Sequence, residues 1–442
     1  MTKPSLPTKD PSDYRNDTLW NLTALAIQAA SGAGIVIGLF FYSGSEYLGI
    51  FSQFYAIFVV AGQFFVFGIH DSVLKHSAEY YFDKIESDRL AFIALALGSI
   101  GAVIGFWLVL LGANFIAEKF YSQKVQFGLI WMAPGIFLFV LNKVLLGLLC
   151  GRQKFKQFSI AQALRSVSLA LLVSMVIILD ISAGYLGACF TFSELMVLFL
   201  QMKFVFSIWQ SGRNLIKSKL DFKFWAKSHL TFGALSMPHG FLSESFIRVD
   251  ILVLAFFIDD AAIGVYSFAA FFVEGIYQIS ILFRNITNPR LVRLIGNKDR
   301  IGLWKQAKKS SGLSILITIL LSIFTLGGFL IIGEFIDIKE IETIKLLMYI
   351  IFPGLIIYSL FVPFDYALLQ GGKPSIQSAY MLTITLLNVS LNILLIPLFG
   401  YIGAAIGTAI ALTISGCLLM VFLHLTFNIF AWPKIKTQDL TF

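Results

Sequence analysis

Twelve long apolar segments dominate this 442-residue chain and limit what it can fold into. Each is long enough to cross the roughly 30 Å hydrocarbon core of a bilayer. We place them near residues 18–42, 47–69, 90–112, 127–149, 158–179, 184–208, 230–257, 262–284, 310–332, 344–368, 376–398 and 401–427. Backbone N–H and C=O groups in lipid must form hydrogen bonds within the segment, which favours helices. The segments also lack the ten-residue stretches of alternating apolar and polar residues that are typical of a β-barrel. The sequence therefore predicts an all-α polytopic membrane protein.

Composition and charge agree with a membrane protein and exclude several other classes. The chain is 58% hydrophobic and 13% charged, and a soluble domain carries roughly twice that charged fraction. The net charge of +8 then bears on topology, and we expect no nucleic-acid partner. The three cysteines lie in or beside apolar segments without metal-ligand spacing, and the chain has no Walker A sequence. We expect no metal and no cofactor.

The distribution of Lys and Arg predicts the orientation of the chain. Most basic residues outside the apolar segments fall on one side of the membrane, the side that also holds both termini. The opposite side carries Lys119, Lys124, Lys339 and Lys345. Because basic residues concentrate in cytoplasmic loops, both termini are predicted to face the cytoplasm. The N-terminus lacks the features of a cleaved signal peptide, so the first segment is expected to remain in the protein.

The two halves of the chain resemble each other. Leu48 to Ser52 (LGIFS) matches Ile263 to Ser267 (IGVYS), with an offset of 215 residues. Gly184 to Ala188 (GYLGA) matches Gly400 to Ala404 (GYIGA), with a similar offset. Two further matches lie in the same order along the chain. Ala133 to Gly135 (APG) matches Phe352 to Gly354 (FPG), and Leu148 to Gly151 (LLCG) matches Leu368 to Gly371 (LLQG). Together they indicate an internal repeat.

The repeat predicts the domain organisation. We expect a cytoplasmic tail, an N-terminal six-helix lobe, a cytoplasmic linker, a C-terminal six-helix lobe and a second tail, at residues 1–17, 18–208, 209–229, 230–427 and 428–442. An even number of helices in each half makes the repeats parallel, with an axis along the membrane normal. Such lobes enclose a central cavity in transporters that work by alternating access. This step from repeat to transport is an analogy between folds.

Ionisable residues inside the apolar segments are candidates for the functional site, because charge in hydrocarbon is costly. Lys143, Arg165 and Arg248 offer a cationic patch for an anionic headgroup, and Arg suits phosphate best because its fork binds two oxygens. The acidic candidates for a proton or cation site are Glu194, Glu244, Asp250, Glu274 and Asp365. Two interpretations stay open. These residues line a polar lumen, or they form sealed pairs between helices.

Proline and glycine add two local predictions. Pro134, Pro238 and Pro353 lie within apolar segments, where each removes a backbone donor and is a candidate hinge or a source of fixed curvature. Gly32, Gly34 and Gly38 in the first segment superficially resemble a dinucleotide loop, but no strand precedes them. We predict that they allow close helix packing instead.

Several stretches resemble the polysaccharide flippases of the multidrug/oligosaccharidyl-lipid/polysaccharide exporter superfamily. They are the run from Phe232 to Arg300, Leu369 to Lys373 (LQGGK), Asn388 to Pro397 (NVSLNILLIP) and Gly400 to Ala405 (GYIGAA). The resemblance covers nearly the whole chain and implies a MATE-like pair of lobes. It implies translocation of undecaprenyl-diphosphate-linked oligosaccharide repeat units across the bacterial cytoplasmic membrane, for O-antigen or exopolysaccharide synthesis. The implied partners are that lipid-linked oligosaccharide, membrane lipids, and the polymerase and chain-length regulator of the same pathway.

Two other functions remain as alternatives. One is a cation-coupled small-molecule exporter, although the first segment lacks the acidic residue that drug-exporting relatives use. The other is a membrane polymerase, ligase or glycosyltransferase. The short outer loops argue against an enzyme, because such enzymes typically carry catalytic residues in a large outer loop.

Overall fold

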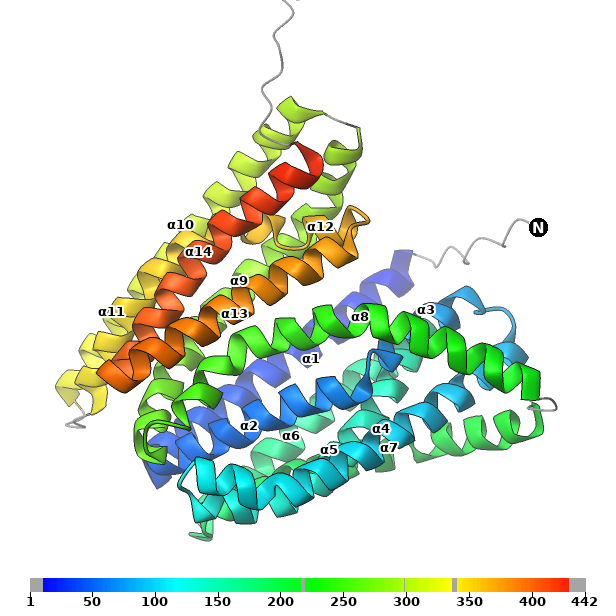
Figure 1. Ribbon diagram of the computed structural model, residues 1–442, viewed down its shortest axis with the longest axis horizontal. Helices are drawn as coiled ribbons and strands as arrows, with labels where there is room; N and C mark the ends of the chain where they lie inside the picture. The colour runs from blue at the N-terminus through cyan, green and yellow to red at the C-terminus, as the bar shows by residue number, and fades with distance from the viewer. Residues whose placement is uncertain (1–10, 216–218, 298, 336–339, 429–442) are drawn as a thin grey trace, which may run out of the picture. The chain divides into compact units, whose positions relative to one another are not determined.

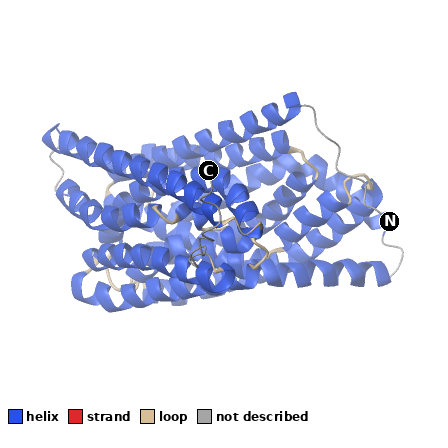
Figure 2. Cartoon of the chain, turned by 90° about the horizontal axis from the view of Figure 1, so that it is seen from above, coloured by secondary structure: helices blue, strands red, loops and turns tan. Residues whose placement is uncertain are grey.

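Every regular element in the computed structural model is helical over the residues that it describes, which are 11–215, 219–297, 299–335 and 340–428 (Figures 1 and 2). Eleven helices within these ranges are long and apolar enough to cross a membrane. The protein is therefore a multi-pass membrane protein, as predicted. The predicted tails before residue 11 and after residue 428, and residues 216–218 of the predicted linker, lie outside the described residues.

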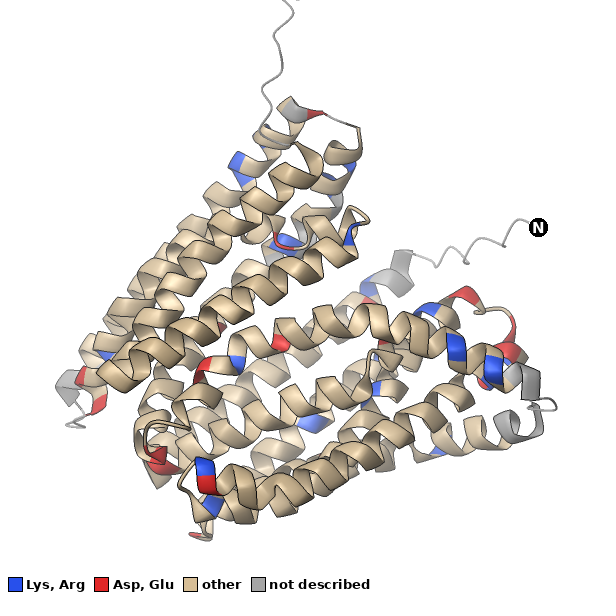
Figure 3. Cartoon of the chain, in the orientation of Figure 1, with Lys and Arg blue, Asp and Glu red and all other residues tan. Residues whose placement is uncertain are grey.

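The predicted segments correspond closely to the observed helices. The long helices are α1 (Pro11–Gly38), α2 (Ser45–Val66), α4 (Lys84–Lys119), α5 (Gln123–Gly151), α6 (Phe155–Ile178), α7 (Leu186–Leu215), α8 (Lys219–Leu254), α9 (Asp260–Gly296), α10 (Arg300–Phe335), α11 (Glu340–Ser359), α13 (Pro374–Phe399) and α14 (Tyr401–Phe427). Charged residues lie mostly toward the helix ends and leave long stretches of helix uncharged (Figure 3).

The chain divides into two compact units, unit 1 (Met1–Phe268) and unit 2 (Ala269–Phe442). In unit 1, α5 packs against α4 and α7, and α1 packs against α6. Its apolar core includes Leu90, Val140 and Leu145. In unit 2, α14 packs against α11 and α13, and α10 packs against α11.

Two predicted segments break earlier than expected. α2 ends at Val66, and Phe67 and Gly68 both adopt left-handed backbone conformations before the short helix α3 (Ile69–Glu79) begins. At this break the chain contacts α8, where a side chain on Gly68 would meet the carbonyl oxygen of Gly233. The tenth predicted segment is too long. α11 ends at Ser359, and a 3-10 turn (η3, Val362–Phe364) and the one-turn helix α12 (Ala367–Gln370) follow.

The predicted cytoplasmic linker, residues 209–229, is mostly helical and belongs to unit 1. α8 runs for 36 residues and packs against α2, α3 and α4. Trp225, near its start, is buried and its indole N–H donates to Glu86 at 2.6 Å. One turn later, buried His229 contacts the Ser72 hydroxyl at 2.9 Å and the Leu90 carbonyl at 3.1 Å. Burial lowers the pKa of His229 to about 4, although the bond to the Leu90 carbonyl acts in the opposite direction.

Repeat-related residues of the two halves pack directly on each other. Gly49, in the first turns of α2, lies so close to α9 that a Cβ atom there would stand 1.8 Å from the carbonyl oxygen of Asp260. A Cβ atom on Gly264 would stand 1.8 Å from the carbonyl oxygen of Ser45. Ser45 and Asp260 are themselves 215 residues apart, as are the two glycines. The contact is therefore reciprocal, which supports the repeat read from the sequence.

The glycine prediction for the first helix is wrong at two positions. A Cβ atom on Gly32 or Gly34 would meet nothing within 4 Å, and only at Gly38 does a neighbour, Ile177, come as close as 3.3 Å. The close packing of unit 1 occurs elsewhere, for example at Gly128 and Gly187, where α5 meets α7. Spacing alone does not separate a glycine that faces a neighbouring helix from one that faces open space.

Candidate functional site

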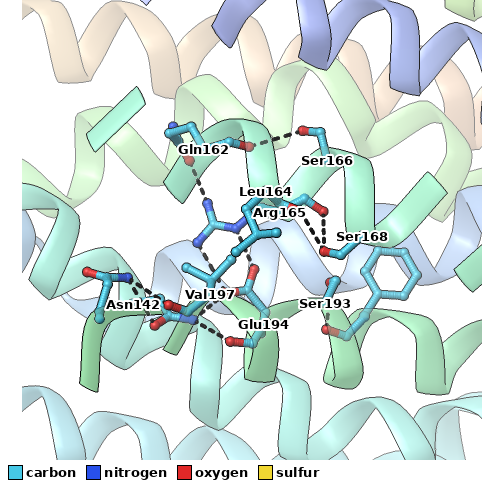
Figure 4. Close-up of polar contacts among 11 residues, drawn as sticks. Asn142, Gln162, Leu164, Arg165, Ser166, Ser168, Ser193, Glu194 and Val197 are labelled. Carbon is cyan, nitrogen blue, oxygen red and sulfur yellow. Dashed lines mark hydrogen bonds and ion pairs between the residues drawn. The ribbon is translucent and has the colours of Figure 1, made fainter. Parts of the chain in front are cut away.

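Arg165 and Glu194 form the best-defined ion pair among the predicted site residues. Arg165 on α6 reaches Glu194 on α7 through two contacts, Nε to Oε1 at 2.6 Å and a second guanidinium nitrogen to Oε2 at 3.1 Å (Figure 4). The Glu194 side chain is 1% exposed, whereas that of Arg165 is 19% exposed. Gln162, one turn before Arg165, accepts a further bond from the guanidinium at 2.9 Å.

Asn142 completes this pair, and sequence reasoning did not single it out. Its side-chain amide donates to Glu194 Oε2 at 2.7 Å and to the Glu194 carbonyl at 2.9 Å. Gln201, two turns after Glu194, donates to the Asn142 side-chain oxygen at 3.5 Å. Asn142 is fully buried in α5. Its only sequence signal is an amide next to a lysine in an otherwise apolar run.

Lys143 connects this pair to the charges of α8. It lies within electrostatic reach of Glu244, Arg165, Asp71 and Glu194. Arg248 donates to Glu244 at 2.7 Å, the i,i+4 pairing that the spacing predicts, and its guanidinium lies 5.1 Å from the centre of the Tyr55 ring. The structure thus brings all three predicted cationic residues into one group.

Two further residues at the start of α3 join this group, and the sequence analysis missed both. His70 Nε2 lies 3.4 Å from Asp71 Oδ1. Burial, with a smaller contribution from Lys143, lowers the pKa of His70 to about 3, so its imidazole is neutral near pH 7. Burial raises the pKa of Asp71, while Lys143 and a hydrogen bond from Ser236 act in the opposite direction.

We call this group the unit 1 charge cluster. Its charged members are Asp71, Lys143, Arg165, Glu194, Glu244 and Arg248, and they come from α3, α5, α6, α7 and α8. The cationic members also contact aromatic rings. The Lys143 ammonium and the Arg165 guanidinium lie 5.6 and 5.3 Å from the centre of the Phe139 ring. Three cations and three carboxylates inside an apolar lobe form a balanced network that can exchange partners with a charged guest.

The remaining predicted acidic residues are divided between the two units. Asp250 on α8 accepts a short hydrogen bond from the buried Tyr266 hydroxyl. Glu274 is half-buried on α9, in unit 2. Asp365, also in unit 2, pairs with Arg284 at 2.9 Å, and the Arg284 guanidinium lies 3.8 Å from the centre of the Tyr366 ring. The eighth predicted segment ends at Arg284, but the structure buries this residue inside α9, which continues to Gly296.

The three predicted hinge prolines all lie inside helices that continue past them. Pro134 is in α5, Pro238 in α8 and Pro353 in α11. A hinge role at these positions stays a prediction. Among the described residues, no group of three or more His, Cys, Asp or Glu side chains is placed to hold a metal ion.

Comparison with known proteins places the fold. The MatE family model matches residues 240–394. An inward-facing multidrug resistance MATE family transporter of the MOP superfamily has a TM-score of 0.71 and 15% identity, covering 91% of this chain and 94% of its own. The lipid II flippase MurJ, in an inward closed conformation, has a TM-score of 0.69 and 18% identity, covering 93% and 90%.

A third similar structure is the Vibrio cholerae MATE transporter VcmN in its bent form, with a TM-score of 0.58, 12% identity and coverage of 93% and 95%. No curated protein matches the sequence. At these identities the comparisons show the fold alone. The chain has the fold of these structures, which include both a multidrug resistance MATE family transporter and the lipid II flippase MurJ.

Proposed function

We propose that this protein is a MOP superfamily flippase that moves undecaprenyl-diphosphate-linked oligosaccharide across the cytoplasmic membrane by alternating access, for surface polysaccharide synthesis. The observation that carries the proposal is the gathering of Lys143, Arg165 and Arg248 in the unit 1 charge cluster. A lipid diphosphate must bring its negative charge through the membrane, and guanidinium groups are the side chains best suited to bind it.

The carboxylates of the cluster explain how such a site holds its cations between transport cycles. Arg165 is held by Glu194 and Arg248 by Glu244, so neither guanidinium is left as an unpaired buried charge. Incoming phosphate oxygens compete with the carboxylates for the same donors. Because binding is an exchange of partners, the headgroup is attracted without being held too tightly to leave.

The two pairs expose opposite members. The Glu244 side chain is 34% exposed, compared with 1% for Glu194, whereas the Arg165 side chain is 19% exposed, compared with 9% for Arg248. We therefore assign first contact with the headgroup to Arg165, whose guanidinium is the more exposed, and a second contact to Arg248, whose carboxylate partner is the easier to displace. Asn142 and Gln162 keep the Arg165–Glu194 pair in place, because both bind it through their side chains.

The experiment is complementation of a bacterial strain that lacks its own flippase, scored by surface glycan. Arg248→Ala should abolish glycan display at unchanged protein abundance, because it leaves behind only the partly exposed Glu244. The matched control is Arg89→Ala, which breaks the Arg89–Glu86 pair of 2.8 Å outside the cluster and should leave display intact. Normal display in the Arg248→Ala strain would refute the proposal.

The alternative is a cation-coupled small-molecule exporter, which the MATE structures favour equally on fold. Its cargo would be drawn to the carboxylates, which the same exchange of partners would release from Arg165 and Arg248. The same strain distinguishes the two functions. An exporter would raise resistance to cationic drugs and would not restore surface glycan.

A further inference from the structure

A pocket of about 390 Å³ opens at the ends of α2, α4 and α9 in unit 1, remote in sequence from most of the charge cluster. Its walls come from three places: Glu46 in the first turn of α2, Phe120 and Tyr121 in the turn between α4 and α5, and residues 257–261 between α8 and α9. Its volume falls in the range of small-molecule sites, about 300–1,000 Å³. The bias of basic residues assigns this end of the molecule to the outside.

One part of the wall is aromatic. Phe120, Tyr121 and Phe257 line the pocket, and the Tyr121 side chain is 90% exposed. Tyr121 also has a positive φ of 52°, a conformation that is uncommon for an aromatic residue. This conformation ends α4 in the same way that Gln153 and Asp180 end α5 and α6. The turn therefore holds a ring away from the core, where packing within the protein does not require it.

The other part of the wall is a set of carboxylates held in fixed positions. Asp260 accepts bonds from Gln53 and Ser122, both at 2.7 Å. Asp259 accepts from the backbone N–H of Ala262 at 2.7 Å. Glu46 is held by Lys124 at 2.6 Å. Each carboxylate has more acceptor positions than these bonds use, so the pocket offers preorganised acceptors to a ligand that brings donors.

From these observations we propose that the pocket binds one hexose unit, neutral or amino-substituted, of a glycan. A pyranose ring has an apolar C–H face that packs on aromatic rings and a rim of hydroxyls that donate to carboxylates. Asp259 and Asp260, which accept from neutral donors, repel uronic acids and phosphate, so the pocket selects the sugar end of a lipid-linked glycan and rejects its headgroup. The choice of a glycan unit rests on the proposed function, but the binding chemistry does not.

The test is saturation-transfer NMR with the purified full-length protein in lipid nanodiscs. The probes are methyl glucoside, methyl glucosaminide, glucuronate and tetramethylammonium. We expect transfer to the ring protons of the first two probes and none to glucuronate. Tyr121→Asn removes the ring while keeping a residue that tolerates positive φ, and it should weaken sugar binding at least tenfold. Asp259→Asn retains an acceptor for the Ala262 N–H and should weaken binding of the amino sugar most.

The matched control is Tyr42→Asn, which removes another highly exposed tyrosine, 83% exposed, that does not line the pocket. It should bind sugars like the unaltered protein. Three results would overturn the proposal. They are the absence of any sugar signal, equal effects of the two tyrosine changes on binding, and Tyr121-dependent binding of tetramethylammonium but of no sugar. The two proposals can fail separately. If the Arg248→Ala strain displays glycan normally, the flippase proposal is refuted. If the purified protein still binds sugar at Tyr121, the pocket assignment stands.

Discussion

Replacing Gly49 by Ala should destabilise unit 1 through a single, measurable clash. A Cβ atom at this position stands 1.8 Å from the Asp260 carbonyl oxygen, whereas carbon and oxygen atoms in close contact are about 3.3–3.6 Å apart. The neighbour is backbone, so no rotamer change relieves the overlap. α2 and the turn before α9 must separate by roughly 1.5 Å, the difference between those distances.

That separation also affects the hydrogen bonds of Asp260. Gln53 and Ser122 both donate to its carboxylate at 2.7 Å, and a shift of this size breaks bonds to a charged group that contribute about 1.5–3 kcal/mol each. Overpacking adds about 1–3 kcal/mol. If only one of the two bonds is lost, the change is still about 3 kcal/mol.

Thermal unfolding of the purified protein in detergent, followed with a thiol-reactive dye, measures the effect. Gly49→Ala and Gly264→Ala should each lower the melting temperature by several degrees, and the double variant should fall by less than the sum, because one separation relieves both clashes. Gly34→Ala is the control, since open space surrounds it. A Gly49→Ala protein as stable as Gly34→Ala would refute the reasoning.

Two further predictions concern buried charge. Asp365→Asn leaves Arg284 buried without its carboxylate and should destabilise the protein by about 3–5 kcal/mol, whereas the double change Arg284→Met and Asp365→Leu should recover most of that loss in the same thermal assay. His229 has a pKa of about 4 in the folded protein, below its unfolded value near 6.5, so the unfolded state binds more protons between these two pH values. The free energy of unfolding should therefore fall by about 3 kcal/mol as the pH drops from above 6.5 to below 4. The His229→Gln protein should lose less stability over this range, and a pH profile identical to that of the unaltered protein would contradict the prediction.

The helices of this protein are predictable because lipid imposes a strong and simple requirement. Long apolar runs locate the long helices, and α14 begins and ends where the sequence predicts, although α8 begins at Lys219, before its predicted segment, and α9 ends at Gly296, well after its own. The break at Phe67 and Gly68 is not predictable in this way, because Phe is no helix breaker and the left-handed turn depends on a contact with Gly233 far along the chain. Local sequence carries no record of such a partner.

The candidate site is predictable in its members more than in its pairings. Arg165 and Glu194 stand out as charges in apolar runs, but their contact depends on how α6 and α7 rotate against each other. Asn142 carries too weak a signal to be chosen. The eighth predicted segment stops at Arg284 because the apolar run ends there, and hydropathy does not show that the helix continues to Gly296. Each miss reflects tertiary contacts that the period of a helix does not encode.

The reciprocal contact of Gly49 with Asp260 and of Gly264 with Ser45 has the form of an isologous interface, the kind made by two identical subunits about a two-fold axis. Within one chain, the two sides carry different residues, because Asp260 has a carboxylate where its counterpart Ser45 has a hydroxyl. Only the Asp260 side can bind Gln53 and Ser122 through a charge. The backbone crossing is thus symmetric while its chemistry is directional, and it presents different side chains to its two neighbours.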